Sequence, residues 1–101
     1  MGTPRLNTRA KGQRIERKAR ALAEAEGSTV FPLYQPAYTK QGAIDFIAVD
    51  SHRIRFVQVR SNQWHDLRPL RALVVPTCDH VTKEAWRFRD GHSRPDKRLI
   101  A

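Results

Sequence analysis

The spacing of hydrophobic residues changes in the first third of the chain, from a helical period to a strand-like one. Within residues 11–26, apolar side chains recur every three or four positions, and Gly27 follows directly. This spacing places the apolar side chains on one side of a helix, and glycine favours helix ends, so a helix is predicted here. Residues 28–34, STVFPLY, are β-branched and aromatic but contain Pro32, which predicts an edge strand.

Two strongly apolar segments occupy the middle of the chain. IDFIAVD, residues 44–50, and RIRFVQVR, residues 53–60, are joined by the polar turn SHR. Strands that are apolar on both faces are typical of the covered centre of a sheet, and so short a turn indicates a β-hairpin. Residues 35–43, before the hairpin, contain proline and glycine and are expected to form a loop.

The last third of the chain predicts a short helix and two further strands. Residues 66–73, DLRPLRAL, have a proline where the helix would begin, and residues 73–77, LVVPT, indicate a strand that ends at Pro76. Residues 84–89, EAWRFR, alternate between aromatic and other side chains, which is typical of a strand. We expect this to be the last strand, with its two aromatic residues in the core.

The order of these elements predicts an α/β fold, a mixed β-sheet flanked by helices with an αβββαβ core. Residues 11–101 are expected to form a single domain, because a chain of 101 residues supplies only one modest hydrophobic core. Residues 1–10 are basic and poor in apolar side chains, so we expect them to form a loose N-terminal arm.

Composition adds a strong positive charge. The 19 Lys and Arg residues against 10 Asp and Glu give a formal net charge of +9, and the isoelectric point is about 10.8. A surplus of this size on a small domain is typical of a protein that binds a polyanion, and nucleic acid is the leading candidate. A merely basic surface, or an RNA or ribosome partner unrelated to nucleases, is the alternative.

Neither a membrane span nor a disulfide is expected. No run approaches the roughly 18 apolar residues that a span needs, and the basic N-terminus is not followed by the apolar core of a signal peptide. The single cysteine, Cys78, has no internal partner. We therefore expect a cytoplasmic protein in a reducing compartment.

Polar residues interrupt the apolar hairpin near one end. Asp45 opens its first segment, and Gln58 and Arg60 stand two apart in the second, where they project from one face of the strand. Buried polar groups are costly without partners, so we expect a shared site. Asp45, Gln58 and the backbone carbonyl of Val59 offer oxygen ligands for Mg²⁺ or Mn²⁺. Arg60 can hold an attacking water or stabilise charge on a phosphorus transition state.

This pattern resembles the PD-(D/E)XK nuclease superfamily, and within it the archaeal-type Holliday junction resolvases and their small phage and archaeal relatives. KGQRIERKARALAEAEG resembles the family's glutamate-bearing helix, GAIDFIAVD its aspartate-bearing strand, and FVQVRSN the strand with its acid or glutamine and its lysine. The resemblance covers residues 11 to about 96 and adds Glu16, as a helix-borne acid and metal ligand, to the expected catalytic residues Asp45, Gln58 and Arg60. It implies a restriction-endonuclease-like fold, a metal-dependent endonuclease acting on duplex or branched DNA, and a homodimer.

Two departures from the family pattern bear on catalysis. The family's lysine is Arg60 here, and an arginine is effectively never deprotonated, so it cannot act as a general base. Gln58 in place of an acid removes a negative charge, which weakens metal binding unless Glu16 or another acid compensates. The alternative function is therefore a catalytically inactive nucleic-acid-binding module on a nuclease-like fold.

Each site residue also has a simpler structural interpretation. Glu16 can lie on a solvated helix face, Asp45 can cap a turn, and Gln58 with Arg60 can form a polar pair on an edge strand. On the nuclease interpretation, seven basic residues and one tryptophan are expected to contact nucleic acid: Arg5, Arg9, Lys11, Arg14, Arg17, Lys18, Lys40 and Trp64.

Overall fold

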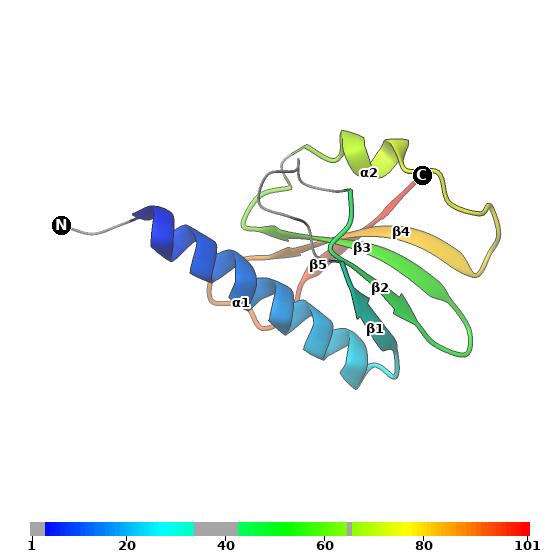
Figure 1. Cartoon of the computed structure of the whole chain (residues 1–101), viewed down its shortest axis with the longest axis horizontal. Coiled ribbons are helices and arrows are strands. Elements are labelled where there is room, and N and C mark those ends of the chain that lie inside the picture. Colours follow the sequence, from blue (N-terminus) through cyan, green and yellow to red (C-terminus); the bar gives the residue numbers. More distant parts are fainter. Residues whose placement is uncertain (1–3, 34–42, 65) are drawn as a thin grey trace.

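The computed structural model describes residues 4–33, 43–64 and 66–101, with side chains from residue 11 onward (Figure 1). The elements are α1 (Pro4–Ala25), β1 (Thr29–Pro32), β2 (Phe46–Val49), β3 (Ile54–Ser61), α2 (Arg68–Ala72), β4 (Val81–Phe88) and β5 (Asp96–Ile100). The expected α/β class and the expected order of a helix, three strands, a helix and a strand are confirmed, and one further strand follows. The loop predicted over residues 35–43 lies almost wholly outside the described residues.

The strands form one mixed sheet in the order β1-β2-β3-β4-β5. Strands β1, β2 and β3 pair antiparallel, β4 runs parallel to β3, and β5 is antiparallel to β4. A parallel neighbour requires the chain to return to the end of the sheet where β3 began, and the connection that does so carries α2. The predicted β2–β3 hairpin and the edge position of β1 are confirmed.

Helix α1 is longer than the sequence predicted. It begins at Pro4 rather than at residue 11, so residues 4–10 are helical and the expectation of a loose arm is wrong for them. Proline suits the first turn of a helix because its missing N–H would have no partner there. At the other end, Gly27 has a φ of 98°, and its N–H and that of Ser28 bond back to carbonyls of the last turn. Among the described residues, no helix is long and apolar enough to cross a membrane.

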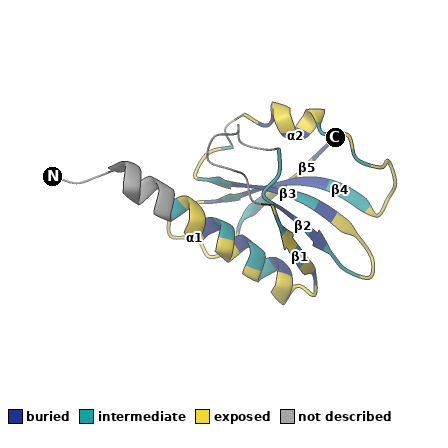
Figure 2. Cartoon of the chain, in the orientation of Figure 1, coloured by how far each residue is buried: buried dark blue, intermediate teal, exposed yellow. Residues whose placement is uncertain are grey.

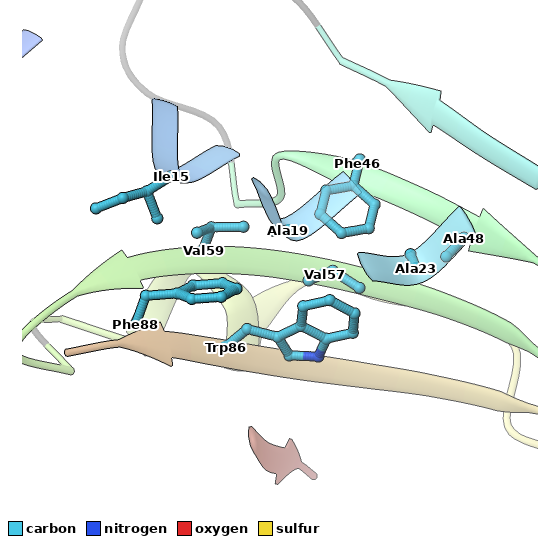
Figure 3. Packing of buried hydrophobic residues seen from close by; sticks show 9 residues of the cluster. All are labelled: Ile15, Ala19, Ala23, Phe46, Ala48, Val57, Val59, Trp86 and Phe88. Atoms are coloured by element: carbon cyan, nitrogen blue, oxygen red, sulfur yellow. The ribbon is translucent and has the colours of Figure 1, made fainter. Parts of the chain in front are cut away.

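The main hydrophobic core lies between α1 and one face of the sheet (Figure 3). Trp86 of β4 is fully buried and meets Phe46 of β2 edge to face, with ring centroids 5.7 Å apart. Phe88 joins them, so the predicted core position of both aromatic residues in β4 is confirmed. The buried members of this core are Ile15, Ala19, Ala23, Phe46, Ala48, Val57, Val59, Trp86 and Phe88.

A second, smaller cluster lies on the other face of the sheet, beneath α2. Its buried members are Leu67, Leu70, Ala85 and Ile100. Ala85 belongs to this cluster while Trp86 belongs to the first, as the alternation of side chains along a strand requires. In Figure 2 the sheet is buried where the helices cover it, while much of the outer side of α1 is exposed. The sheet therefore has two faces, each with its own cover.

Two predictions about the end of the chain are wrong. Residues 73–77 form no strand, and Val74 is 93% exposed, so this apolar run finds no sheet partner; Pro76 also lacks the N–H that a ladder needs. The last strand is not residues 84–89 but β5, which pairs with β4 at the sheet edge. Its sequence DKRLI is mostly polar and only Ile100 is buried, which is typical of a strand at a sheet edge.

Candidate active site

Asp45 lies where three strands meet. Its backbone N–H donates to the carbonyl of Val57 in β3 at 2.8 Å, and its carbonyl accepts from Leu33 after β1 at 3.0 Å. Its side-chain Oδ2 accepts from the backbone N–H of Val59 at 2.7 Å. The carboxylate is therefore fixed just before the start of β2, next to the part of β3 that carries Gln58.

Glu16 of α1 reaches the same point. Its side chain is hydrogen-bonded to Asp45, so the fold brings together two residues that have β1 between them in the sequence. The pKa of Glu16 is raised to about 7, first by burial and then by the hydrogen bond to Asp45 and its negative charge; Arg20 opposes these effects. The structure thus brings together the two acids that the sequence placed in one site.

Gln58 stands beside this acid pair in β3. Asp45 is hydrogen-bonded to both sequence neighbours of Gln58. Its backbone N–H donates to the carbonyl of Val57, and its side chain accepts from the N–H of Val59. Gln58 is 2% exposed, and the parallel register sets it opposite Ala85, so its side chain lies on the face covered by α2. The expected edge-strand alternative is wrong, because β3 is the central strand of the sheet.

Arg60 lies two residues further along the same face. Its guanidinium is half-buried and donates to the carbonyls of Val59 at 3.3 Å and Asp66 at 3.4 Å. Burial lowers the pKa of Arg60, and the charges of Asp45 and Asp66 oppose that shift. Its buried Nε has no hydrogen-bond partner among the described residues. The guanidinium therefore keeps a donor for a further acceptor near Asp45.

The Val59 carbonyl, expected to be a third metal ligand, accepts a hydrogen bond from Arg60 at 3.3 Å. Within the described ranges, no three His, Cys, Asp or Glu side chains gather into a group that could hold a metal. The site offers two carboxylates, Glu16 and Asp45, while the side chain of Gln58 lies on the face of the sheet covered by α2. Mg²⁺ in phosphate-processing sites is typically bound by one or two carboxylates together with waters and substrate oxygens, and this donor set fits that kind of site.

The basic residues expected to bind nucleic acid fall into several groups. Lys40 and the side chains of Arg5 and Arg9 lie outside what the structure describes. Arg14 and Arg17 are exposed on α1, on the helix turns that flank Glu16. These two guanidiniums are therefore accessible to a polyanion in solvent.

Two other basic residues of α1 contact the turn after β4. Lys11 forms an ion pair with Asp90 at 2.7 Å. Lys18 donates to the carbonyl of His92 at 2.9 Å, and its ammonium lies 5.3 Å from the ring centroid of Phe88. Both lysines therefore help to hold α1 against the β4–β5 turn, a role that the sequence did not indicate.

Trp64 is half-buried and contacts two arginines that the sequence analysis did not place in a site. The guanidinium carbons of Arg87 and Arg98 lie 4.8 Å and 4.3 Å from its ring centroid. Arg87 had a signal in the sequence, since it alternates with Trp86 and so faces away from the main core. Arg98 had none, because its strand was not predicted.

Comparison with protein-family models, curated proteins and solved structures finds no match for this chain. The fold and the site define the chain as a small mixed α/β domain with an acid pair at the end of its central hairpin. Its assignment to the PD-(D/E)XK superfamily is taken up below as a proposal.

Proposed function

We propose that this protein is a metal-dependent DNA endonuclease of the PD-(D/E)XK type with a restriction-endonuclease-like fold. The observation that carries the proposal is the contact between Glu16 on α1 and Asp45 at the start of β2. Two acids in contact repel each other once both ionise, and a divalent cation between them turns that repulsion into attraction. The mixed sheet, with β4 parallel to β3, agrees with the fold that the resemblance implies.

In this proposal Glu16, Asp45 and Gln58 hold Mg²⁺ or Mn²⁺. The bound ion would supply a water nucleophile at neutral pH and would neutralise charge at the phosphorus. Arg60 donates hydrogen bonds to an oxygen of the reacting phosphate, from a half-buried position where such bonds are stronger than in water. Arg60 does not move a proton, because a guanidinium stays charged.

A nucleic-acid-binding module without cleavage is the second candidate, and one contact favours it. Arg60 donates to the Val59 carbonyl, the oxygen expected to serve as a metal ligand. With Gln58 in place of an acid as well, the site has two carboxylates rather than three. If this donor set is too weak for a metal, the basic surface still binds nucleic acid with a steep salt dependence.

The test is cleavage of labelled single-stranded, duplex and four-way-junction DNA with Mg²⁺ or Mn²⁺. Asp45→Asn is the informative variant, because an amide oxygen can still accept from the Val59 N–H while the charge is lost. Asp79→Asn is the matched control, since Asp79 is an exposed acid in the turn before β4. We expect cleavage that requires metal, is abolished by EDTA, is lost in Asp45→Asn and is kept in Asp79→Asn.

Tight DNA binding without cleavage in the wild type, unchanged in Asp45→Asn, would replace the nuclease proposal with the binding module. The branched substrate and the homodimer follow from the resemblance alone, so they stay predictions. Preference for the four-way junction over the duplex tests the first, and the molar mass in solution at the concentration of the cleavage assay tests the second.

A further inference from the structure

A cluster of arginines around Trp64 stands beside the candidate active site. Trp64 follows β3, Arg87 lies in β4, and Arg98 lies in β5 at the sheet edge. The guanidinium carbons of Arg87 and Arg98 lie within 5 Å of the indole centroid, at 4.8 Å and 4.3 Å. Such cation–π contacts order otherwise mobile side chains, so the two guanidiniums are pre-positioned.

The charges of this cluster do not balance. Asp96 pairs with Arg87 at 2.7 Å and with Arg89 at 3.2 Å, and these arginines hold the pKa of Asp96 below its usual value. Arg98 is exposed and has no carboxylate within 4 Å among the described residues. Two guanidiniums therefore share one carboxylate and that of Arg98 has none, which leaves the cluster with a positive charge that a bound anion can neutralise.

The pairing of the strands places this cluster next to the candidate site. Arg60 is registered opposite Arg87, so the two arginines are neighbours on one face of the sheet. Two residues earlier in β3, Gln58 is registered opposite Ala85 of β4, and Ala85 is in turn registered opposite Arg98 of β5. Adjacent strands are about 4.8 Å apart, so the backbones at Gln58 and Arg98 lie about 10 Å apart. A cationic row thus runs from the acid pair toward the β5 edge.

We propose that Arg87 and Arg98, positioned by Trp64, form a phosphate-binding subsite for the substrate strand, one step from the reacting phosphate. The inference rests on the proposed function, because it takes the acid pair as the reaction centre. A planar guanidinium matches phosphate through paired hydrogen bonds, and two such groups at a fixed separation select a polynucleotide backbone. Trp64 acts in this subsite as a positioning residue and not as a platform for stacking bases.

The first test is binding of labelled DNA in EDTA, followed by fluorescence anisotropy at several salt concentrations. Arg98→Gln should weaken binding and lower the slope of log K against log salt by about 1, the loss of one phosphate contact. Trp64→Leu should weaken binding in the same direction and Trp64→Phe should restore most of it, because a phenyl ring keeps the cation–π contact. Arg53→Gln removes the same charge just before the opposite end of β3, where Arg53 pairs with Asp50, and should leave the slope unchanged.

The second test separates the subsite from the reaction. Arg98→Gln should raise KM for an oligonucleotide several-fold more than it lowers kcat, and the increase should be smaller for a phosphodiester with no second phosphate, such as bis(4-nitrophenyl) phosphate. A wild-type salt slope in Arg98→Gln, with cleavage that still depends on Asp45, would overturn the subsite and leave the nuclease standing. A reduced slope in a protein that never cleaves would support the subsite and overturn the nuclease.

Discussion

At the scale of single residues, the contact between Glu16 and Asp45 has a consequence for stability. The pKa of Glu16 is about 7 in the folded protein, against an ordinary value of 4.5. The folded state therefore binds a proton more tightly than the unfolded state between these values, so stability falls as the pH rises from about 4.5 to about 7 and levels off above. After allowance for solvent screening at a partly exposed group, the loss is about 1 to 2 kcal/mol.

Glu16→Gln tests this coupling in EDTA by urea unfolding at pH 5 and pH 8. Glutamine resembles the protonated acid, so the variant should be more stable than the wild type by about 1 to 2 kcal/mol at pH 8 and nearly equal to it at pH 5. Glu24→Gln, on the exposed side of the same helix, is the control and should show no such difference between the two pH values. An equal effect of Glu16→Gln at both pH values would contradict the coupling.

A second prediction at this scale concerns the role of Arg60. Its guanidinium interacts with the charge of Asp45 and keeps a buried Nε that no described group accepts. If it stabilises charge on the reacting phosphate, Arg60→Gln should lower kcat by about 100-fold with a smaller change in KM. Arg60→Lys restores the cation and should keep most of the activity. The measurement is kcat and KM of both variants on the DNA substrate that the wild type cleaves best. A lysine variant as inactive as the glutamine variant would show that guanidinium geometry is required.

At the scale of elements, sequence patterns predicted what local periodicity controls. The hairpin that carries Asp45 and Gln58 was predicted because both of its strands are apolar on two faces, a feature of the sheet centre. β5 was missed, because an edge strand needs few apolar residues, and residues 73–77 were assigned to a strand although they find no partner. The Arg60 contact with the Val59 carbonyl depends on side-chain rotamers, which no sequence pattern encodes.

The packing of α1 on the sheet gives a prediction for the same scale. Ala19 is fully buried and faces the strands, while Ala21 on the same helix is exposed. Ala19→Leu inserts three carbon atoms into a filled interface and should destabilise the protein by about 1 to 3 kcal/mol. Ala21→Leu makes the same change in solvent and should alter stability by less than about 0.5 kcal/mol. Urea unfolding of both variants provides the measurement, and equal effects would mean that α1 does not pack as described.

At the scale of the whole molecule, part of the positive charge is already engaged by acids of the fold. The chain has a net charge of +9, yet Lys11, Arg55 and Lys97 are paired with acids or buried in the fold. Arg14 and Arg17 stay exposed on α1, and the Trp64 cluster presents Arg87 and Arg98 beside Arg60.

If the protein binds DNA as proposed, the exposed arginines of α1 predict where the salt dependence of that binding originates. Removal of both exposed guanidiniums in the double variant Arg14→Gln, Arg17→Gln should lower the slope of log K against log salt by about 2, because each phosphate contact contributes about 0.9. The double variant Arg53→Gln, Arg71→Gln removes the same charge elsewhere on the surface and should weaken binding at low salt with little change in slope. Anisotropy titrations from about 50 to 300 mM KCl separate the two. Equal slopes for both double variants would mean that net charge alone attracts DNA, without a track along α1 that leads to Glu16 and Asp45.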